Sequence, residues 1–127
     1  MDIRSIEKVE PSQEHKATST VWWLVKPREM YEDTLGGHLE LVSEFELKGG
    51  GKVNPHSHPL YEFYYVTSGK GYMQIDDEIE LVSQGDLIKI PPDAVHSMWT
   101  FSETAPVRGF IFAVGVKDAP VIDYTSH

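Results

Sequence analysis

Residues 50–69 of this 127-residue chain read GGKVNPHSHPLYEFYYVTSG, and this stretch decides how the rest is interpreted. His56 and His58 are two positions apart, and residues two apart on a strand point to the same face. Glu62 follows at a further even spacing, so it shares that face if the chain resumes a strand after Pro59. Two imidazoles and a carboxylate on one face form a ligand set for a divalent metal ion.

A fourth candidate, His96, follows the turn at 91–94 and joins the set only if its strand lies beside the others. A lone histidine on a strand is more often a solvent-facing or hydrogen-bonded residue than a ligand. The even offsets, flanked by glycine and proline, favour the metal site here. The remaining histidines stand outside the pattern and are assigned no role: His15, His38 and His127.

The rest of the chain is typical of a β protein. Segments rich in β-branched and aromatic residues recur about every 8–12 residues between turn residues, and no long segment has helical periodicity. One short helical turn at 27–31 is compatible with the sequence. We therefore predict an all-β sandwich or barrel. Its expected strands are 18–26, 38–47, 61–67, 71–75, 78–82, 86–90, 95–101 and 107–116, with 71–75 and 78–82 forming a hairpin.

Composition limits the class of protein. A length of 127 residues corresponds to about one domain. The net charge of −9 disfavours nucleic acid and anionic membranes as partners. The absence of cysteine excludes disulfides and cysteine-based zinc sites. The N-terminus has no apolar signal segment, and no apolar run approaches the ~20 residues of a membrane span, so a cytoplasmic location is the default expectation.

The glycine, histidine and glutamate residues of this chain resemble the two sequence motifs of the cupin superfamily. The first cupin motif, G-x5-H-x-H-x3-E-x6-G, is matched at every position by Gly50, His56, His58, Glu62 and Gly69. The second motif, G-x5-P-x-G-x2-H-x3-N, is matched in part by Gly85, Pro91 and His96. Asp93 stands where that motif has glycine, and Thr100 stands where it has asparagine. Aspartate still tolerates the backbone of a tight turn.

The resemblance implies a small single-domain cupin whose fold is a double-stranded β-helix, or jelly-roll, barrel. We expect an N-terminal arm at 1–17, the barrel at 18–117 and a C-terminal tail at 118–127. The resemblance also implies one divalent transition metal ion (Fe, Mn, Ni, Co or Zn), bound by His56, His58, Glu62 and His96. Four protein ligands leave coordination positions open for substrate, water or dioxygen.

Even offsets from the ligands predict which other side chains face the barrel interior. Tyr64, two residues after Glu62, is the predicted catalytic residue because a phenol near a metal can donate a hydrogen bond or a proton. It can equally be a packed core ring. The other expected pocket residues are Phe45, Met73, Met98, Thr100 and Phe112. Gln74 is the alternative to Met73 on the hairpin strand, and Ile111 is the alternative to Phe110 and Phe112 on the last strand.

This predicted lining is apolar and aromatic, and Arg108 is the only cation that falls near it. It favours a small, weakly polar or aromatic substrate over a phosphorylated sugar or a diacid. On the outward face, Tyr61, Phe63 and Tyr65 beside one of the adjacent tryptophans, Trp22 or Trp23, would form a large apolar patch. Cupins often form dimers through such faces, so we predict a homodimer.

The leading functional hypothesis is a metal-dependent enzyme acting on a small organic molecule. Within it, an Fe(II)-type dioxygenase or related oxidoreductase comes first, because an apolar pocket with an open metal position suits dioxygen chemistry. A lyase, decarboxylase or isomerase that uses the metal as a Lewis acid is the alternative. A non-catalytic, small-molecule-binding cupin is a further alternative.

Overall fold

The structure is a computed structural model that describes residues 1–14, 16 and 19–120. Its elements in chain order are β1 (Asp2–Ser5), β2 (Ser12–Glu14), β3 (Ser19–Val21), α1 (Tyr31–Thr34), β4 (His38–Leu47), β5 (Lys52–His56), β6 (Leu60–Ser68), β7 (Lys70–Ile75), β8 (Glu78–Ser83), β9 (Asp86–Ile90), β10 (His96–Thr100) and β11 (Val107–Gly115). The helix has four residues, and no described helix is long and apolar enough to cross a membrane.

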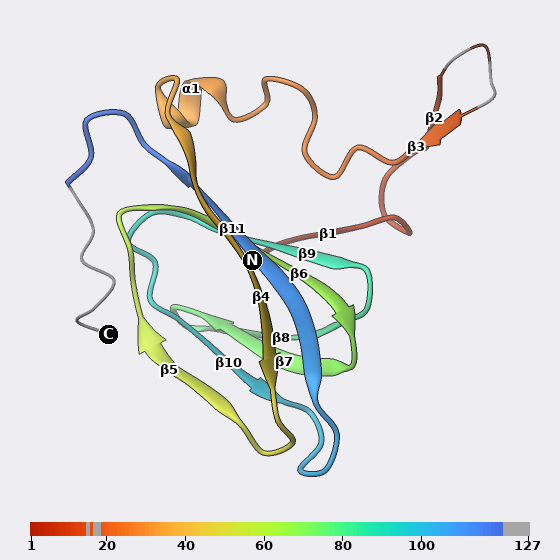
Figure 1. Ribbon diagram of the computed structural model, residues 1–127, viewed down its shortest axis with the longest axis vertical. Coiled ribbons are helices and arrows are strands. Elements are labelled where there is room, and N and C mark those ends of the chain that lie inside the picture. Colours follow the sequence, from red (N-terminus) through yellow and green to blue (C-terminus); the bar gives the residue numbers. More distant parts are fainter. Residues whose placement is uncertain (15, 17–18, 121–127) are drawn as a thin grey trace.

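Two antiparallel sheets face each other (Figure 1). The five-stranded sheet has the order β1-β9-β6-β11-β4, and the four-stranded sheet has the order β5-β10-β7-β8. Consecutive strands therefore often lie in different sheets, as in a jelly roll. This arrangement confirms the prediction of an all-β barrel.

The core lies between the two sheets. Its fully buried side chains come from the alternate, inward-facing positions of several strands, among them Val66, Met73, Ile88 and Met98. Seven of the eight predicted strands are present within a few residues of their expected bounds, and β7 and β8 form the predicted hairpin. Local alternation and glycine or proline at the turns were sufficient to locate them.

The segment 18–26 does not form the predicted long strand. Of its described residues only 19–21 are β-structured, and they pair with β2 in a separate two-stranded sheet. The barrel edge is occupied instead by β1, which pairs with β9. The predicted helical turn at 27–31 is also displaced, since the helix begins at Tyr31.

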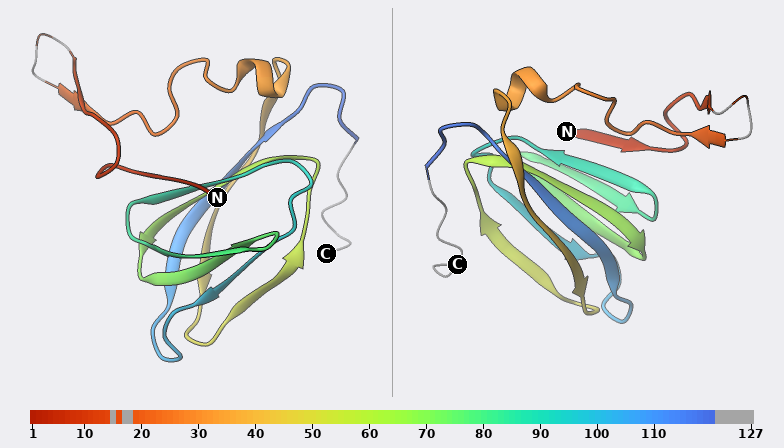
Figure 2. Two further views of the ribbon diagram at one scale, coloured as in Figure 1. Left: turned by 180° about the vertical axis from the view of Figure 1, so that it is seen from behind. Right: turned by 45° about the horizontal axis from the view of Figure 1, so that its top comes forward.

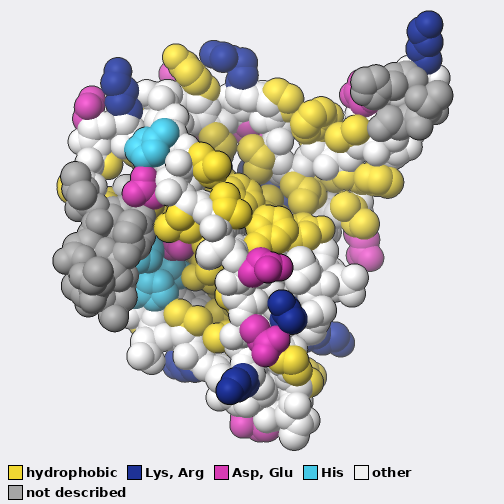
Figure 3. All heavy atoms as spheres, viewed as in Figure 1, with side chains coloured by type: hydrophobic (Ala, Val, Ile, Leu, Met, Phe, Trp, Pro, Cys, Tyr) yellow, Lys and Arg dark blue, Asp and Glu magenta, His cyan; other side chains and the backbone are white. Residues whose placement is uncertain are grey.

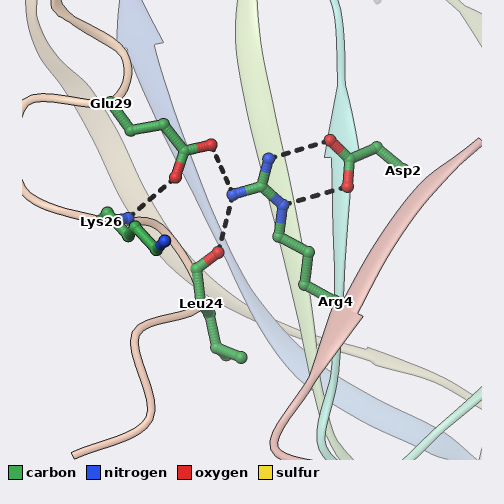
Figure 4. A network of polar contacts seen from close by, with 5 residues as sticks. All are labelled: Asp2, Arg4, Leu24, Lys26 and Glu29. Carbon is green, nitrogen blue, oxygen red and sulfur yellow. Dashed lines mark hydrogen bonds and ion pairs between the residues drawn. The ribbon is translucent and has the colours of Figure 1, made fainter. Parts of the chain in front are cut away.

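An arginine on β1 fixes the segment that follows β3. The Arg4 guanidinium donates to the carbonyl oxygen of Leu24 at 2.8 Å and pairs with Glu29 at 2.7 Å and Asp2 at 3.0 Å (Figure 4). Glu29 in turn accepts a hydrogen bond from the backbone N–H of Lys26 at 2.9 Å. The Leu24 carbonyl oxygen therefore accepts a hydrogen bond from a side chain and not from a neighbouring strand. Residues 22–26 accordingly form a loop.

The β2–β3 hairpin projects away from the barrel (Figures 1 and 2). Trp22 and Trp23 follow it directly and are 42% and 40% exposed. On the predicted strand 18–26, two adjacent tryptophans would point to opposite faces and one of them would be buried in the barrel. That expectation is wrong, because both tryptophans lie on a loop and not on a barrel strand. His15, His127 and most of the predicted tail at 118–127 lie outside the described residues.

Candidate metal centre

The four predicted ligands lie together at one end of the barrel. His56 ends β5, His58 lies in the connection to β6, Glu62 is in β6 and His96 begins β10. One potential ligand atom from each residue lies within 4.8 Å of the others. His58, Glu62 and His96 are buried, and His56 is half-buried. Residues 40 positions apart in the sequence thus form one compact cluster of three imidazoles and one carboxylate.

Strand register explains why His96 joins the other three. His96 is directly opposite His56 where β10 pairs antiparallel with β5. The turn before β10 is fixed by a second contact, because the backbone N–H of Asp93 donates to the carbonyl of His58 at 2.8 Å. Asp93 has a φ of 66°, in the left-handed region that glycine favours. Aspartate therefore supplies the turn geometry at the position where the cupin motif has glycine.

The hydrogen bonds of the imidazoles determine which nitrogen faces the cluster. Nδ1 of His96 lies 3.0 Å from the carbonyl of Ala94, and Nδ1 of His56 lies 2.7 Å from the carbonyl of Asn54. A carbonyl can only accept, so each Nδ1 carries the proton and donates it. In the neutral rings Nε2 is then left as a lone-pair acceptor, which is the form that binds a metal ion.

This tautomer creates a conflict at the centre of the cluster. Nε2 of His96 lies 3.0 Å from Oε1 of Glu62, and both atoms are acceptors. Both are buried and have no hydrogen-bond partner among the described residues. Nε2 of His58 approaches the same carboxylate oxygen at 3.6 Å. A cation among these atoms removes the conflict, so the donor set fits a bound metal ion.

Tyr64 lies next to the cluster on the inner face of β6. Its ring is 3% exposed and meets the His96 ring edge-on, with centroids 6.1 Å apart. Burial, and then the negative charge of Glu62, raise the pKa of Tyr64 well above its usual value. The phenol is therefore protonated at neutral pH and is available as a hydrogen-bond donor. Its role in catalysis remains a prediction.

Three other predicted pocket residues face the interior. Phe45 packs against Tyr64 at 5.7 Å between ring centroids, and Met73 and Met98 are buried opposite each other on β7 and β10. Met73 and Met98 belong to the apolar core, and Phe45 packs against it.

Thr100 lies at the other end of the barrel. It is four residues from His96 along β10, or about 13 Å at the rise of an extended strand. Its hydroxyl accepts a hydrogen bond from the backbone N–H of Gly50 at 2.8 Å, so it fixes the β4–β5 turn.

Phe112 does not line the interior, which corrects the sequence-based expectation. It is opposite Phe63 in the sheet and stacks on that ring, at 4.7 Å between centroids, on the outer face. Ile111, the alternative residue, is opposite Tyr64 and packs against the core. Arg108 also points outward, is 52% exposed and pairs with Glu46 at 3.4 Å. β11 alternates regularly, with Val107, Gly109 and Ala113 buried, but both of its faces carry apolar residues, so the sequence did not show which face was inward.

Sequence reasoning did not find the two carbonyls that orient the ligands. Each belongs to the residue two positions before its histidine, Asn54 before His56 and Ala94 before His96. Every residue has a carbonyl, so no side-chain signal could have revealed them. Metal-binding histidines usually donate their other ring N–H to such an acceptor, which fixes the orientation of the ring.

The family model described as a cupin domain matches residues 43–112, which is more than half of the chain. This chain belongs to the cupin family. A solved cupin protein from Bacteroides fragilis is 26% identical with a TM-score of 0.57, covering 77% of this chain and 83% of that one. A cupin 2 conserved barrel domain protein from Salinispora arenicola is 18% identical with a TM-score of 0.52, covering 57% and 60% of the two chains. The latter likeness concerns the fold alone.

Two curated proteins are also similar to this cupin. A gentisate 1,2-dioxygenase from Haloferax is 28% identical over 72 residues, which are 57% of this chain and 18% of that enzyme. An uncharacterized protein from Methanocaldococcus jannaschii is 35% identical over 63 residues, which are 49% of this chain and 50% of that protein. The chain thus spans half or less of the length of these relatives.

Proposed function

We propose that this cupin is a metal-dependent enzyme that acts on a small organic molecule, with oxidation by dioxygen at an Fe(II)-type centre as the leading reaction. The observation that carries the proposal is the pair of buried acceptors, Glu62 Oε1 and His96 Nε2, 3.0 Å apart. Such a pair is costly unless a cation lies beside it. A divalent ion held by these three histidines and one glutamate would supply Lewis acidity and open positions for substrate or dioxygen.

The protein's own residues contribute orientation and exclusion of water. The carbonyls of Asn54 and Ala94 hold two imidazoles in the metal-binding tautomer. Glu62 contributes the negative charge of the set. The protonated phenol of Tyr64, edge-on to His96, is suited to donate a hydrogen bond to a polar group of the substrate.

The side chains near the cluster support one class of substrate. Phe45, Tyr64 and Met98 are apolar neighbours, and Arg108, the one cation expected nearby, points to solvent. Among the residues that the structure describes, no lysine or arginine is buried, which disfavours phosphorylated and doubly acidic substrates. Similarity to a gentisate 1,2-dioxygenase supports an aromatic or otherwise weakly polar molecule. We therefore favour neutral or singly charged aromatic compounds.

Metal analysis followed by oxygen uptake tests the proposal. The protein is purified without chelator, its metal content is measured, and it is loaded with Fe(II) under anaerobic conditions. Oxygen consumption is then followed with gentisate, catechols, β-diketones and thiols. We expect about one metal ion per chain, and uptake with one substrate class that is lost in His96→Ala. Glu46→Gln, a change at an exposed carboxylate, is the control that keeps both.

The outcomes separate the hypotheses. Absence of stoichiometric binding of any divalent metal would refute the metal-dependent enzyme. Stoichiometric metal without oxygen uptake for any substrate class would refute the dioxygenase. That result would favour Lewis-acid chemistry, as in a lyase, decarboxylase or isomerase, or a binding role.

A further inference from the structure

We infer that a cleft at the metal end of the barrel binds the part of the substrate that is remote from the metal, and that His38 recognises a hydroxyl group there. The cleft lies between β4, β6 and β11 and has a volume of about 190 Å³. Its lining includes His38, Glu40, Pro59, Leu60, Gly115 and Val116. The inference rests on the proposed function and extends it by naming a group that the substrate carries.

The cleft adjoins the candidate metal centre through the chain between two of the predicted ligands. Pro59 and Leu60, which form one wall, directly follow His58 and precede Glu62. Leu60 and Glu62 are two residues apart on β6, which is about 7 Å along an extended strand. A molecule that binds a metal ion at the cluster and is a little longer than one aromatic ring would therefore reach the cleft.

Strand register brings His38 to this end of the barrel. His38 is opposite Gly115 in β11, and Gly115 is opposite Leu60 in β6. Residues directly opposite in adjacent strands share a face, and the buried side chain of Leu60 marks that face as the inner one. His38 therefore lies in the inner row next to the row of Glu62 and Ala113. Figure 3 shows histidine side chains at two places on one side of the molecule, with acidic side chains between them.

Two backbone features place the His38 ring. A Cβ at Gly115 would lie 2.7 Å from Cε1 of His38, so the imidazole lies directly over the glycine backbone, and a larger residue there would displace it. In β4, the pairing with β11 passes from Leu41 to Leu39 and skips Glu40. Such a β-bulge redirects a side chain, and here the carboxylate of Glu40 meets His38.

The contact with Glu40 determines what His38 offers to a ligand. Nε2 of His38 lies 2.6 Å from Oε2 of Glu40. A carboxylate can only accept, so Nε2 carries the proton and donates it. In the neutral ring Nδ1 is then left as an acceptor, which binds an O–H donor. The His38 side chain is 68% exposed, so a ligand in the cleft can reach it.

Size and charge define the ligand group. A complete small-molecule site has a volume of about 300–1,000 Å³, so a cleft of about 190 Å³ fits one end of a ligand and not a whole one. Among the described residues that line the cleft, none is a lysine or arginine, and Glu40 places a negative charge beside the imidazole. A carboxylate end is therefore disfavoured. A hydroxyl group satisfies Nδ1 of His38, so the substrate class narrows to compounds with a hydroxyl group remote from the metal.

Isothermal titration calorimetry with substituted catechols tests the inference. The protein is loaded with Zn(II), which has no redox chemistry, so that binding is measured without turnover. The catechol oxygens bind the metal, and the side arm ends in a methyl, hydroxyl or carboxylate group in 4-propylcatechol, 4-(2-hydroxyethyl)catechol and 3,4-dihydroxyphenylacetate. We expect the hydroxyl arm to bind about 5-fold more tightly than the methyl arm of the same length. The carboxylate arm should bind no more tightly than the methyl arm.

Variants assign the preference to residues. His38→Phe keeps a ring of similar size but cannot accept a hydrogen bond, so the hydroxyl arm should lose its advantage over the methyl arm. Glu40→Ala leaves the imidazole without its partner and should reduce that advantage by about half or more. Glu44→Ala, the same change at an exposed carboxylate on β4, is the matched control and should keep it. All three variants should bind as much metal as wild type.

The outcomes separate this inference from the proposed function. Equal binding of the methyl and hydroxyl arms to wild type would overturn the inference, as would a preference that survives in His38→Phe. Tightest binding of the carboxylate arm would overturn it too, because His38 would then act as a cation. In each of these cases the metal site stands. A protein that binds no metal, or that binds metal and none of the catechols, would overturn the proposed function and the inference together.

Discussion

Replacing Glu62 by glutamine is expected to stabilise the metal-free protein and to destabilise it relative to wild type once metal is added. Without metal, Glu62 Oε1 and His96 Nε2 are two buried acceptors 3.0 Å apart. A buried polar group without a partner costs about 1–3 kcal/mol. The glutamine amide has nearly the same shape, removes the negative charge and can donate to His96 Nε2. We expect a gain of about 1–3 kcal/mol in the free energy of unfolding.

Adding metal should reverse the order of stability, so that wild type becomes more stable than Glu62→Gln. A ligand that binds only the folded protein, at 100 times its dissociation constant, stabilises it by about 2.7 kcal/mol. Glutamine is a weaker ligand than a carboxylate, so Glu62→Gln should lose most of this stabilisation. Urea unfolding in mildly alkaline buffer, first with chelator and then with Mn(II) or Ni(II), measures both states. For a chain of 127 residues, each kcal/mol corresponds to about 3–5 °C in the melting temperature.

The control is Glu46→Gln, the same chemical change at a carboxylate that is 44% exposed and pairs with Arg108. It should change stability by less than about 0.5 kcal/mol, equally with and without metal. The reasoning is refuted if Glu62→Gln is less stable than wild type in chelator. It is also refuted if both proteins gain the same stability from metal.

Three further results are expected. His96→Ala should abolish metal binding while circular dichroism shows a retained fold, because the apolar cluster between the sheets is formed by other side chains; metal that survives the change would contradict the ligand assignment. Asp93→Val should lower the free energy of unfolding by about 1–2 kcal/mol, since a β-branched residue is strained at a φ of 66°, whereas Asp93→Gly should not. Arg4 lowers the pKa of Asp2, and the backbone N–H of Lys26 lowers that of Glu29, so these contacts stabilise the N-terminal segment above about pH 4–5. As the pH falls through these lowered pKa values that stabilisation is lost, and tryptophan fluorescence should report release of the segment at acid pH in wild type but little change in Arg4→Ala.

The elements that the sequence predicts well are those set by local pattern. His38–Leu47 alternates at most positions, and it forms β4 with the expected bounds, although its pairing with β11 skips Glu40. His56, His58 and Glu62 lie within seven residues, so their proximity is local, but the chain crosses from one sheet to the other between His56 and Glu62, and the three do not share the single strand face that their even spacing predicts. His96 depends on a pairing between β10 and β5 that no local pattern shows. The motif resemblance supplied that fourth ligand.

Other features depend on competition between distant segments. Residues 18–26 have the composition of a strand, but the edge of the barrel sheet is formed by β1, which pairs with β9. The carbonyl of Leu24 accepts a hydrogen bond from Arg4. The face of Phe112 depends on which side of β11 packs on the core, and because Phe110, Ile111 and Phe112 make both sides apolar, the sequence does not decide it. The requirement for glycine at position 69 also depends on a distant segment. At its φ of 83°, a Cβ would lie 2.3 Å from the carbonyl oxygen of Pro106, a neighbour that only the folded chain brings close.

The position of the cluster connects metal binding to the closure of the barrel. His56 and His96 belong to the four-stranded sheet, whereas Glu62 belongs to the five-stranded sheet. At the opposite end, Thr100 fixes the β4–β5 turn through Gly50. At the cluster end, the sheets meet through polar acceptors that repel one another without a cation. An ion bound there would link the two sheets in addition to the apolar core, so metal binding should stabilise this end of the barrel most. The apolar core between the ends does not require the ion, which is why loss of a ligand is expected to remove the metal and leave the fold.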